Sequence, residues 1–203
     1  MPDFAVGNRV GESYCLTALT PILRDAPGAP VSYQARLREV LSQLPDGAAS
    51  PFARVATIHL CRLVIIEDSK YEGFPTKKDH FRNAYLLLSA DLAGDLDDSL
   101  DALVAAAPEA VDAIWRNCVG YPGIGEPRAF VEYLKRCQIR TSFFFGGYPQ
   151  ASLHEVLKAL AVQERFTKFA VAAQDLTPQG LKERFNQLME EITRLPAPRP
   201  GTR

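Results

Sequence analysis

The sequence lacks most of the features that assign a protein to a functional class at once. Its four cysteines (Cys15, Cys61, Cys118 and Cys137) are widely spaced, with no C-x-x-C pair and no zinc-like spacing. This spacing predicts neither a disulfide framework nor a zinc site. We therefore expect reduced, mostly buried thiols in a reducing compartment.

An excess of one charge and long hydrophobic runs are also missing. The net charge is −1, which gives no general attraction to nucleic acid or to an anionic membrane. No apolar run approaches the roughly 20 residues of a membrane span, and the N-terminus has no basic segment followed by an apolar core. We therefore expect a cytoplasmic protein that binds neither nucleic acid nor membrane.

Catalytic motifs are scarce as well. The sequence has three histidines, and it contains neither H-E-x-x-H nor G-x-x-x-x-G-K-[ST]. The glycine-rich loop from Val119 to Pro127 does not directly follow a strand and open a helix, as a dinucleotide-binding loop should. Nucleotide binding is not predicted.

What is present indicates an ordinary globular chain. Of the 203 residues, 47% are hydrophobic and 23% charged, which is enough apolar material for a real core. We predict an α+β domain over residues 1–173, a C-terminal amphipathic helix over 174–196 and a disordered tail over 197–203.

Four segments have the composition of strands: Tyr14–Thr20, Thr57–Ile66, Phe81–Ala90 and the aromatic run 141–148. Helical patterns lie between the first and second strands and between the third and fourth. The order βαββαβ predicts a ferredoxin-like antiparallel sheet with helices on one face, plus extra helices. The bare face of such a sheet predicts pairing with a second copy.

Two further helices are predicted near the C-terminus. Ser152 and Glu155 have the spacing of a capping box that opens a long helix, and Thr177 caps a later one. The later helix carries a narrow seam of apolar residues: Leu181, Phe185, Leu188, Ile192 and Leu195. The seam packs either on its own chain or on another subunit.

Three blocks carry a resemblance to a known group: S-P-F-A-R-V-A-T-I-H-L-C-R-L-V-I-I-E-D, I-W-R-N-C-V-G-Y-P-G and T-S-F-F-F-G-G-Y-P. With the strand order, they resemble the dimeric α/β-barrel superfamily, and more narrowly an uncharacterised bacterial group distantly similar to haem-peroxidase-associated modules. The resemblance covers about Tyr14 to Ala170. It implies a homodimer, an oxidoreductase-like activity, and haem or a hydrophobic small molecule as ligand. The G-x-x-D-G motif of dye-decolourising peroxidases is absent.

His59 and Arg62 are the candidate catalytic residues. His59 is a candidate haem-iron ligand or general base, or else a buried histidine satisfied by a carbonyl or by Thr17. Arg62 lies on the opposite face of a regular strand. It is a candidate for stabilising negative charge, or else an ion-pair partner of Asp91, Glu67 or Asp68.

The remaining candidates surround a ligand. Cys61 shares the face of His59, and Phe143 and Phe145 form either an interface or the floor of an aromatic pocket. The insertion Lys70–His80 carries Lys77, Lys78 and His80 and is either a lid that binds carboxylates or a solvated surface. We therefore predict a cofactor-binding set in which His59 is the metal ligand. Its members are Thr17, His59, Cys61, Phe143, Phe145, Lys77 and His80.

Two functions remain open from the sequence. The first is an oxidoreductase-like protein that binds haem or a hydrophobic small molecule on the open face of the sheet. The second is a non-catalytic module that uses the sheet face and the last helix to assemble with itself or with a partner. The lone histidine and arginine favour the first function, and the missing catalytic motif favours the second.

Overall fold

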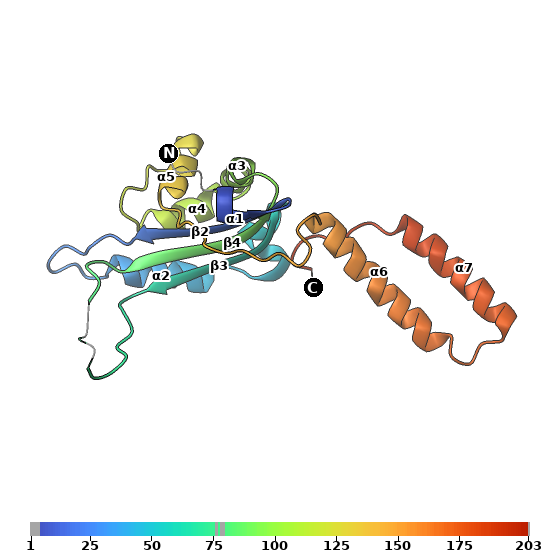
Figure 1. Ribbon diagram of the computed structural model, residues 1–203. Helices are drawn as coiled ribbons and strands as arrows, with labels where there is room; N and C mark the ends of the chain where they lie inside the picture. Colours follow the sequence, from blue (N-terminus) through green and yellow to red (C-terminus); the bar gives the residue numbers. More distant parts are fainter. Residues whose placement is uncertain (1–4, 76, 78–79, 203) are drawn as a thin grey trace.

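The computed structural model describes residues 5–75, 77 and 80–202. A sheet with helices on one face forms the main body, and a pair of long helices projects from it (Figure 1). The predicted α+β class with an antiparallel sheet is confirmed.

The sheet has the order β1-β2-β4-β3, and all neighbouring strands are antiparallel. Its strands are β1 (Arg9–Val10), β2 (Ser13–Pro21), β3 (Ile58–Ile66) and β4 (Tyr85–Ala93). β4 lies a few residues later than the predicted Phe81–Ala90, because residues 81–84 are taken up by the end of the insertion.

Burial alternates along the two central strands, as the two-residue period of a strand requires. On β2 and β4 every second side chain is buried, and the side chains between them stay partly exposed. The buried set faces the helices α2 (Tyr33–Gln43), α3 (Leu96–Ala106), α4 (Pro108–Trp115) and α5 (Pro127–Arg136). The sheet therefore has one covered face and one open face.

The core of the covered side is built around aromatic residues of α4 and α5. Trp115 and Phe130 are fully buried, and their ring centroids lie 5.2 Å apart in an edge-to-face arrangement. Asp95 and Ser32 cap α3 and α2 with their side chains, which fixes where these helices begin. Two 3₁₀ turns, η1 (Gly47–Ala49) and η2 (Pro51–Arg54), lead into β3, and the short α1 (Ala5–Asn8) precedes β1.

The predicted fourth strand over residues 141–148 does not form. The chain instead meets β2 just before this segment, through an isolated antiparallel bridge between Ala18 and Gln138. Ladder pairing ends there because Gly146, Gly147 and Pro149 disfavour a strand, and Phe143 and Phe145 gain no burial. Residues 141–148 therefore follow β2 without regular secondary structure.

The projecting pair consists of α6 (Leu153–Ala172) and α7 (Pro178–Arg194). The predicted capping box of Ser152 and Glu155 is confirmed, and so is the cap of α7 by Thr177. α7 packs on α6 of the same chain, and Leu188 is the buried residue of its seam. None of the described helices combines the length and the apolar character that a bilayer-spanning segment needs.

Beyond α7 the chain returns to the main body (Figure 1). Gly201 has a φ of +73°, and a Cβ there would lie 2.3 Å from the carbonyl carbon of Gly47. Only glycine fits such a close approach in the left-handed region of backbone conformation. Gly201 therefore sits against η1.

Candidate functional site

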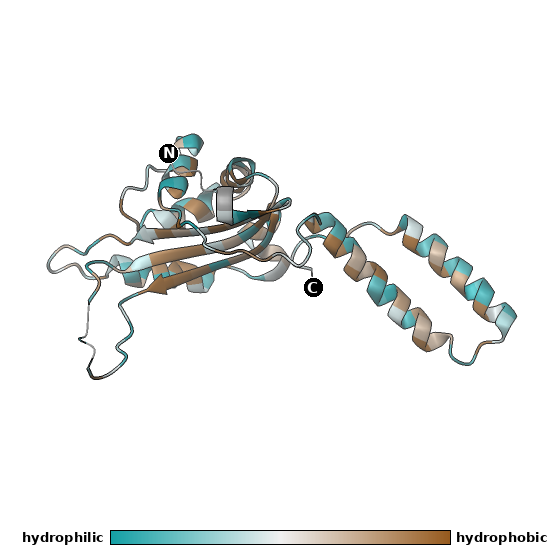
Figure 2. Cartoon of the chain, in the orientation of Figure 1, coloured by the Kyte–Doolittle hydropathy of each residue, from teal (hydrophilic) through white to brown (hydrophobic). Residues whose placement is uncertain are grey.

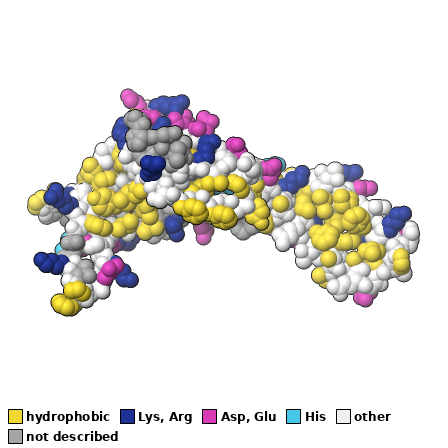
Figure 3. All heavy atoms as spheres, viewed as in Figure 1, with side chains coloured by type: hydrophobic (Ala, Val, Ile, Leu, Met, Phe, Trp, Pro, Cys, Tyr) yellow, Lys and Arg dark blue, Asp and Glu magenta, His cyan; other side chains and the backbone are white. Residues whose placement is uncertain are grey.

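The open face of the sheet exposes apolar side chains to solvent. It carries Cys15, Thr17 and Leu19 of β2, Leu60, Arg62, Val64 and Ile66 of β3, and Tyr85, Leu87, Ser89 and Asp91 of β4. The strands are largely hydrophobic (Figure 2), and hydrophobic side chains form a band over the sheet (Figure 3). Leu60, near the start of the edge strand β3, is 69% exposed and contributes apolar surface to this face.

Two opposite charges stand within this apolar face. Arg62 lies opposite Ser89, and Asp91 lies one pair further along β4, opposite Leu60. The predicted ion pair of Arg62 with Asp91, Glu67 or Asp68 is not present within the described residues. Glu67 pairs with Arg38 and Asp68 with His80, and both acids follow the end of β3 at Ile66. Among the described residues, the guanidinium of Arg62 thus has no carboxylate partner within 4.0 Å.

His59 does not belong to the regular alternation that forms the open face. It is the extra residue of a β-bulge between Ile58 and Leu60, so the strand is not regular at this point. His59 lines a groove of about 380 Å³ together with Phe52, Leu153 and Gly201. Its Nε2 is buried and has no hydrogen-bond partner in the described part of the chain. The predicted partner Thr17 sits on β2, with β4 between them.

Burial lowers the pKa of His59, and the nearby Asp91 opposes this only in part. As the pH falls, His59 therefore takes up a proton in the unfolded chain at a higher pH than in the folded chain. The free energy of unfolding should then decrease below about pH 6.5. We expect urea unfolding at pH 7.5 and 5.5 to show this loss, and a His59→Gln variant to lose less. An equal loss in both proteins would contradict the assignment.

The cysteines are not poised as nucleophiles. Burial raises the pKa of Cys61 to about 12 and that of Cys118 to about 11. Burial, together with the Asp91 carboxylate, also raises the pKa of Cys15. A thiol needs a lowered pKa to react as a thiolate near neutral pH. The expectation of structural thiols agrees with these environments.

The other predicted residues lie at the margins of the sheet. Phe143 and Phe145 are 81% and 77% exposed in the segment beside β2. Lys77 is exposed in the insertion, and Lys78 lies outside the described residues. Nδ1 of His80 lies 2.5 Å from the Asp68 carboxylate, which also accepts the backbone N–H of Phe81.

This hydrogen bonding closes the base of the insertion. Phe81 and then His80 lower the pKa of Asp68 to about 2. His80 therefore holds the insertion to the end of β3 through the contact of its imidazole with the Asp68 carboxylate.

Haem needs an axial ligand, apolar walls and cations for its carboxylates at one place. His59 lies at the start of β3, whereas Lys77 and His80 follow the other end of this nine-residue strand, roughly 25 Å away. Phe143 and Phe145 flank β2 on the far side of β4. The predicted binding set is thus dispersed, and these residues do not fit a haem. Among the described residues, no group of three or more His, Cys, Asp or Glu side chains is placed so that it could hold a metal ion.

Sequence reasoning missed Leu60, Val64 and Asp91 as site residues. The alternation of Leu60, Arg62, Val64 and Ile66 was visible in the sequence. It did not say which side of β3 the helices cover, because both sides are apolar. Which side of β3 the helices cover depends on the register of β3 with β4.

In comparisons with known proteins, no family model, no curated protein and no solved structure matches this chain.

Proposed function

We propose that the protein is a self-assembling, non-catalytic module whose open sheet face packs on the same face of a second copy. One observation carries the proposal: the open face combines exposed apolar side chains with Asp91 and with Arg62, which has no ion pair to the residues that the structure describes. An apolar face in water favours burial by about 25 cal/mol for each Å² removed from solvent. A second copy supplies both the apolar surface and the missing charge partners.

Two-fold symmetry makes the charges complementary. Two packed sheets lie about 10 Å apart, and their inner side chains interdigitate. With a two-fold axis between the sheets and midway between the two charges, Arg62 of each copy faces the partner's Asp91. The pair then forms twice, as an isologous interface requires.

The topology supports pairing of the dimeric α/β-barrel kind. The bridge at Gln138 places a strand-like segment beside β2, on the side away from β4. β1 pairs with β2 on this side as well. With β1 set aside, the arrangement of the Gln138 segment, β2, β4 and β3 is compatible with a ferredoxin-like βαββαβ sheet whose last strand is reduced to one bridge, and this supports the proposal.

An oxidoreductase activity has less support from the described residues. His59, Arg62, Lys77 and His80 do not converge, and Cys61 keeps its proton. General acid–base chemistry requires groups within hydrogen-bond reach of one reacting atom. The proposal is therefore confined to assembly.

Matched substitutions at two valines test this proposal. Val64 is 37% exposed on the open face, and Val119 is 42% exposed in the loop after α4. We expect Val64→Glu to dissociate the dimer, because burying a further carboxylate between two apolar sheets costs free energy and the new acid would compete with the partner's Asp91 for Arg62. Val119→Glu should leave the dimer intact. Sedimentation velocity of both variants and of the natural chain measures the difference.

Equal sedimentation of all three proteins as dimers would place the interface elsewhere. A natural chain that stays monomeric at high micromolar concentration would overturn the proposal. Circular dichroism spectra of the two variants control for folding.

A further inference from the structure

The projecting pair of α6 and α7 has a second surface that suits a binding partner. Two helices alone bury only part of their apolar residues, and Phe185 and Met189 remain 43% and 45% exposed. A groove of about 430 Å³ runs between the helices, with Phe169, Ala172 and the buried Leu188 among its lining residues. A third helix laid along such a groove would complete a small bundle.

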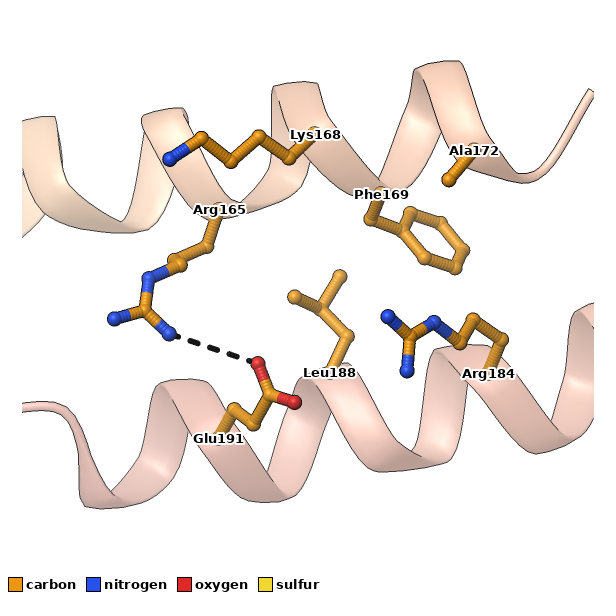
Figure 4. Close-up of a pocket in the computed structure, with 7 residues that line it drawn as sticks. All are labelled: Arg165, Lys168, Phe169, Ala172, Arg184, Leu188 and Glu191. Atoms are coloured by element: carbon orange, nitrogen blue, oxygen red, sulfur yellow. Dashed lines mark ion pairs between the residues drawn. The ribbon is translucent and has the colours of Figure 1, made fainter.

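The rim of this groove is basic. Arg165 and Lys168 of α6 and Arg184 of α7 line it, with Glu191 as the one acid among the lining residues (Figure 4). Arg165 lies 3.7 Å from Glu191, and Lys168 lies 2.8 Å from Glu164 on its own helix. Exposed ion pairs such as these contribute little free energy, so Arg165 and Lys168 can exchange them for contacts with a bound partner.

Arg184 differs from the other two cations. It donates a hydrogen bond of 3.0 Å to the side-chain oxygen of Gln187, and it forms no ion pair within the described residues. Gln187 orients the guanidinium without neutralising it. A charged donor beside an apolar groove is suited to a carboxylate on a bound partner.

We propose that the groove between α6 and α7 binds an acidic amphipathic helix of another protein. Its apolar face would cover Phe169 and Ala172, and its carboxylates would meet Arg184 and Lys168. Charge decides against a second copy as occupant, because two such grooves face to face would bring like charges together. This site is separate from the open sheet face and does not depend on its role.

A designed peptide probes the groove directly. We would use an 18-residue fluorescein-labelled helix with leucines at i, i+3, i+4 and i+7 spacing, flanked by glutamates. A second peptide carries lysines in place of the glutamates. Fluorescence anisotropy with the full-length protein should show binding of the acidic peptide, weakened by salt, and no binding of the basic one.

Two charge reversals on α7 form the matched pair of variants. Arg184→Glu should weaken binding roughly tenfold or more. Lys182→Glu, two positions away and outside the groove lining, should change binding less than about threefold. Arg184→Gln, which keeps an exposed polar side chain, should give an intermediate loss and guards against a folding defect.

Equal binding of both peptides, or no effect of Arg184→Glu, would overturn the proposal. Binding of an 18-nucleotide RNA in place of the acidic peptide would also overturn it, since the groove would then recognise phosphates. An Arg62→Asp variant should bind the peptide like the natural chain, which separates this site from the sheet interface.

Discussion

Replacing Arg62 with aspartate is expected to convert the dimer into monomers. The variant places two acids where the interface needs an opposite pair, and the repulsion occurs twice by symmetry. We expect the dissociation constant to rise roughly 30-fold to 1,000-fold, about 2–4 kcal/mol. Light scattering after size-exclusion chromatography measures the masses.

Asp91→Arg should have the same effect, and the double variant Arg62→Asp/Asp91→Arg should recover the dimer. Recovery would show that the two charges act as one pair. Arg128→Asp on α5 makes the same charge change on the helical side and should stay dimeric. A double variant as monomeric as either single variant would rule out the reciprocal pair.

The same substitution at two phenylalanines is expected to change the free energy of unfolding by very different amounts. Phe130 is fully buried against Trp115, whereas Phe143 is 81% exposed beside β2. Phe130→Ala removes a buried ring and leaves a cavity, which costs about 3–5 kcal/mol of unfolding free energy. Phe143→Ala should stay within about 0.5 kcal/mol.

Urea unfolding of both variants at fixed protein concentration checks this expectation, since dimer dissociation contributes to the midpoint. A large loss on Phe143→Ala would mean that the aromatic segment is packed in solution. Phe143 would then belong to an interface, as one of the two sequence interpretations has it.

The sequence predicted the elements whose signals are local. Capping side chains at Ser152 and Thr177 and the apolar seam of α7 placed the last two helices correctly. β3 was found by composition because seven of its nine residues are apolar, which suits a strand. These signals need no knowledge of distant residues.

The sequence did not predict what depends on pairing between strands. A bulge at His59 removes this residue from the regular alternation, and no local pattern encodes that bulge. The open face follows from the register of β3 with β4, which brings Arg62 and Asp91 together on one surface. The prediction of a strand over residues 141–148 was wrong because it gave the three phenylalanines more weight than Gly146 and Gly147, which disfavour a strand.

Sedimentation equilibrium of the natural chain from low to high micromolar concentration tests self-assembly most directly. Self-assembly through the open face predicts a mass of twice 22.4 kDa, lost in Arg62→Asp and restored in Arg62→Asp/Asp91→Arg. A mass of one chain at every concentration, or a dimer that Arg62→Asp leaves intact, would contradict it.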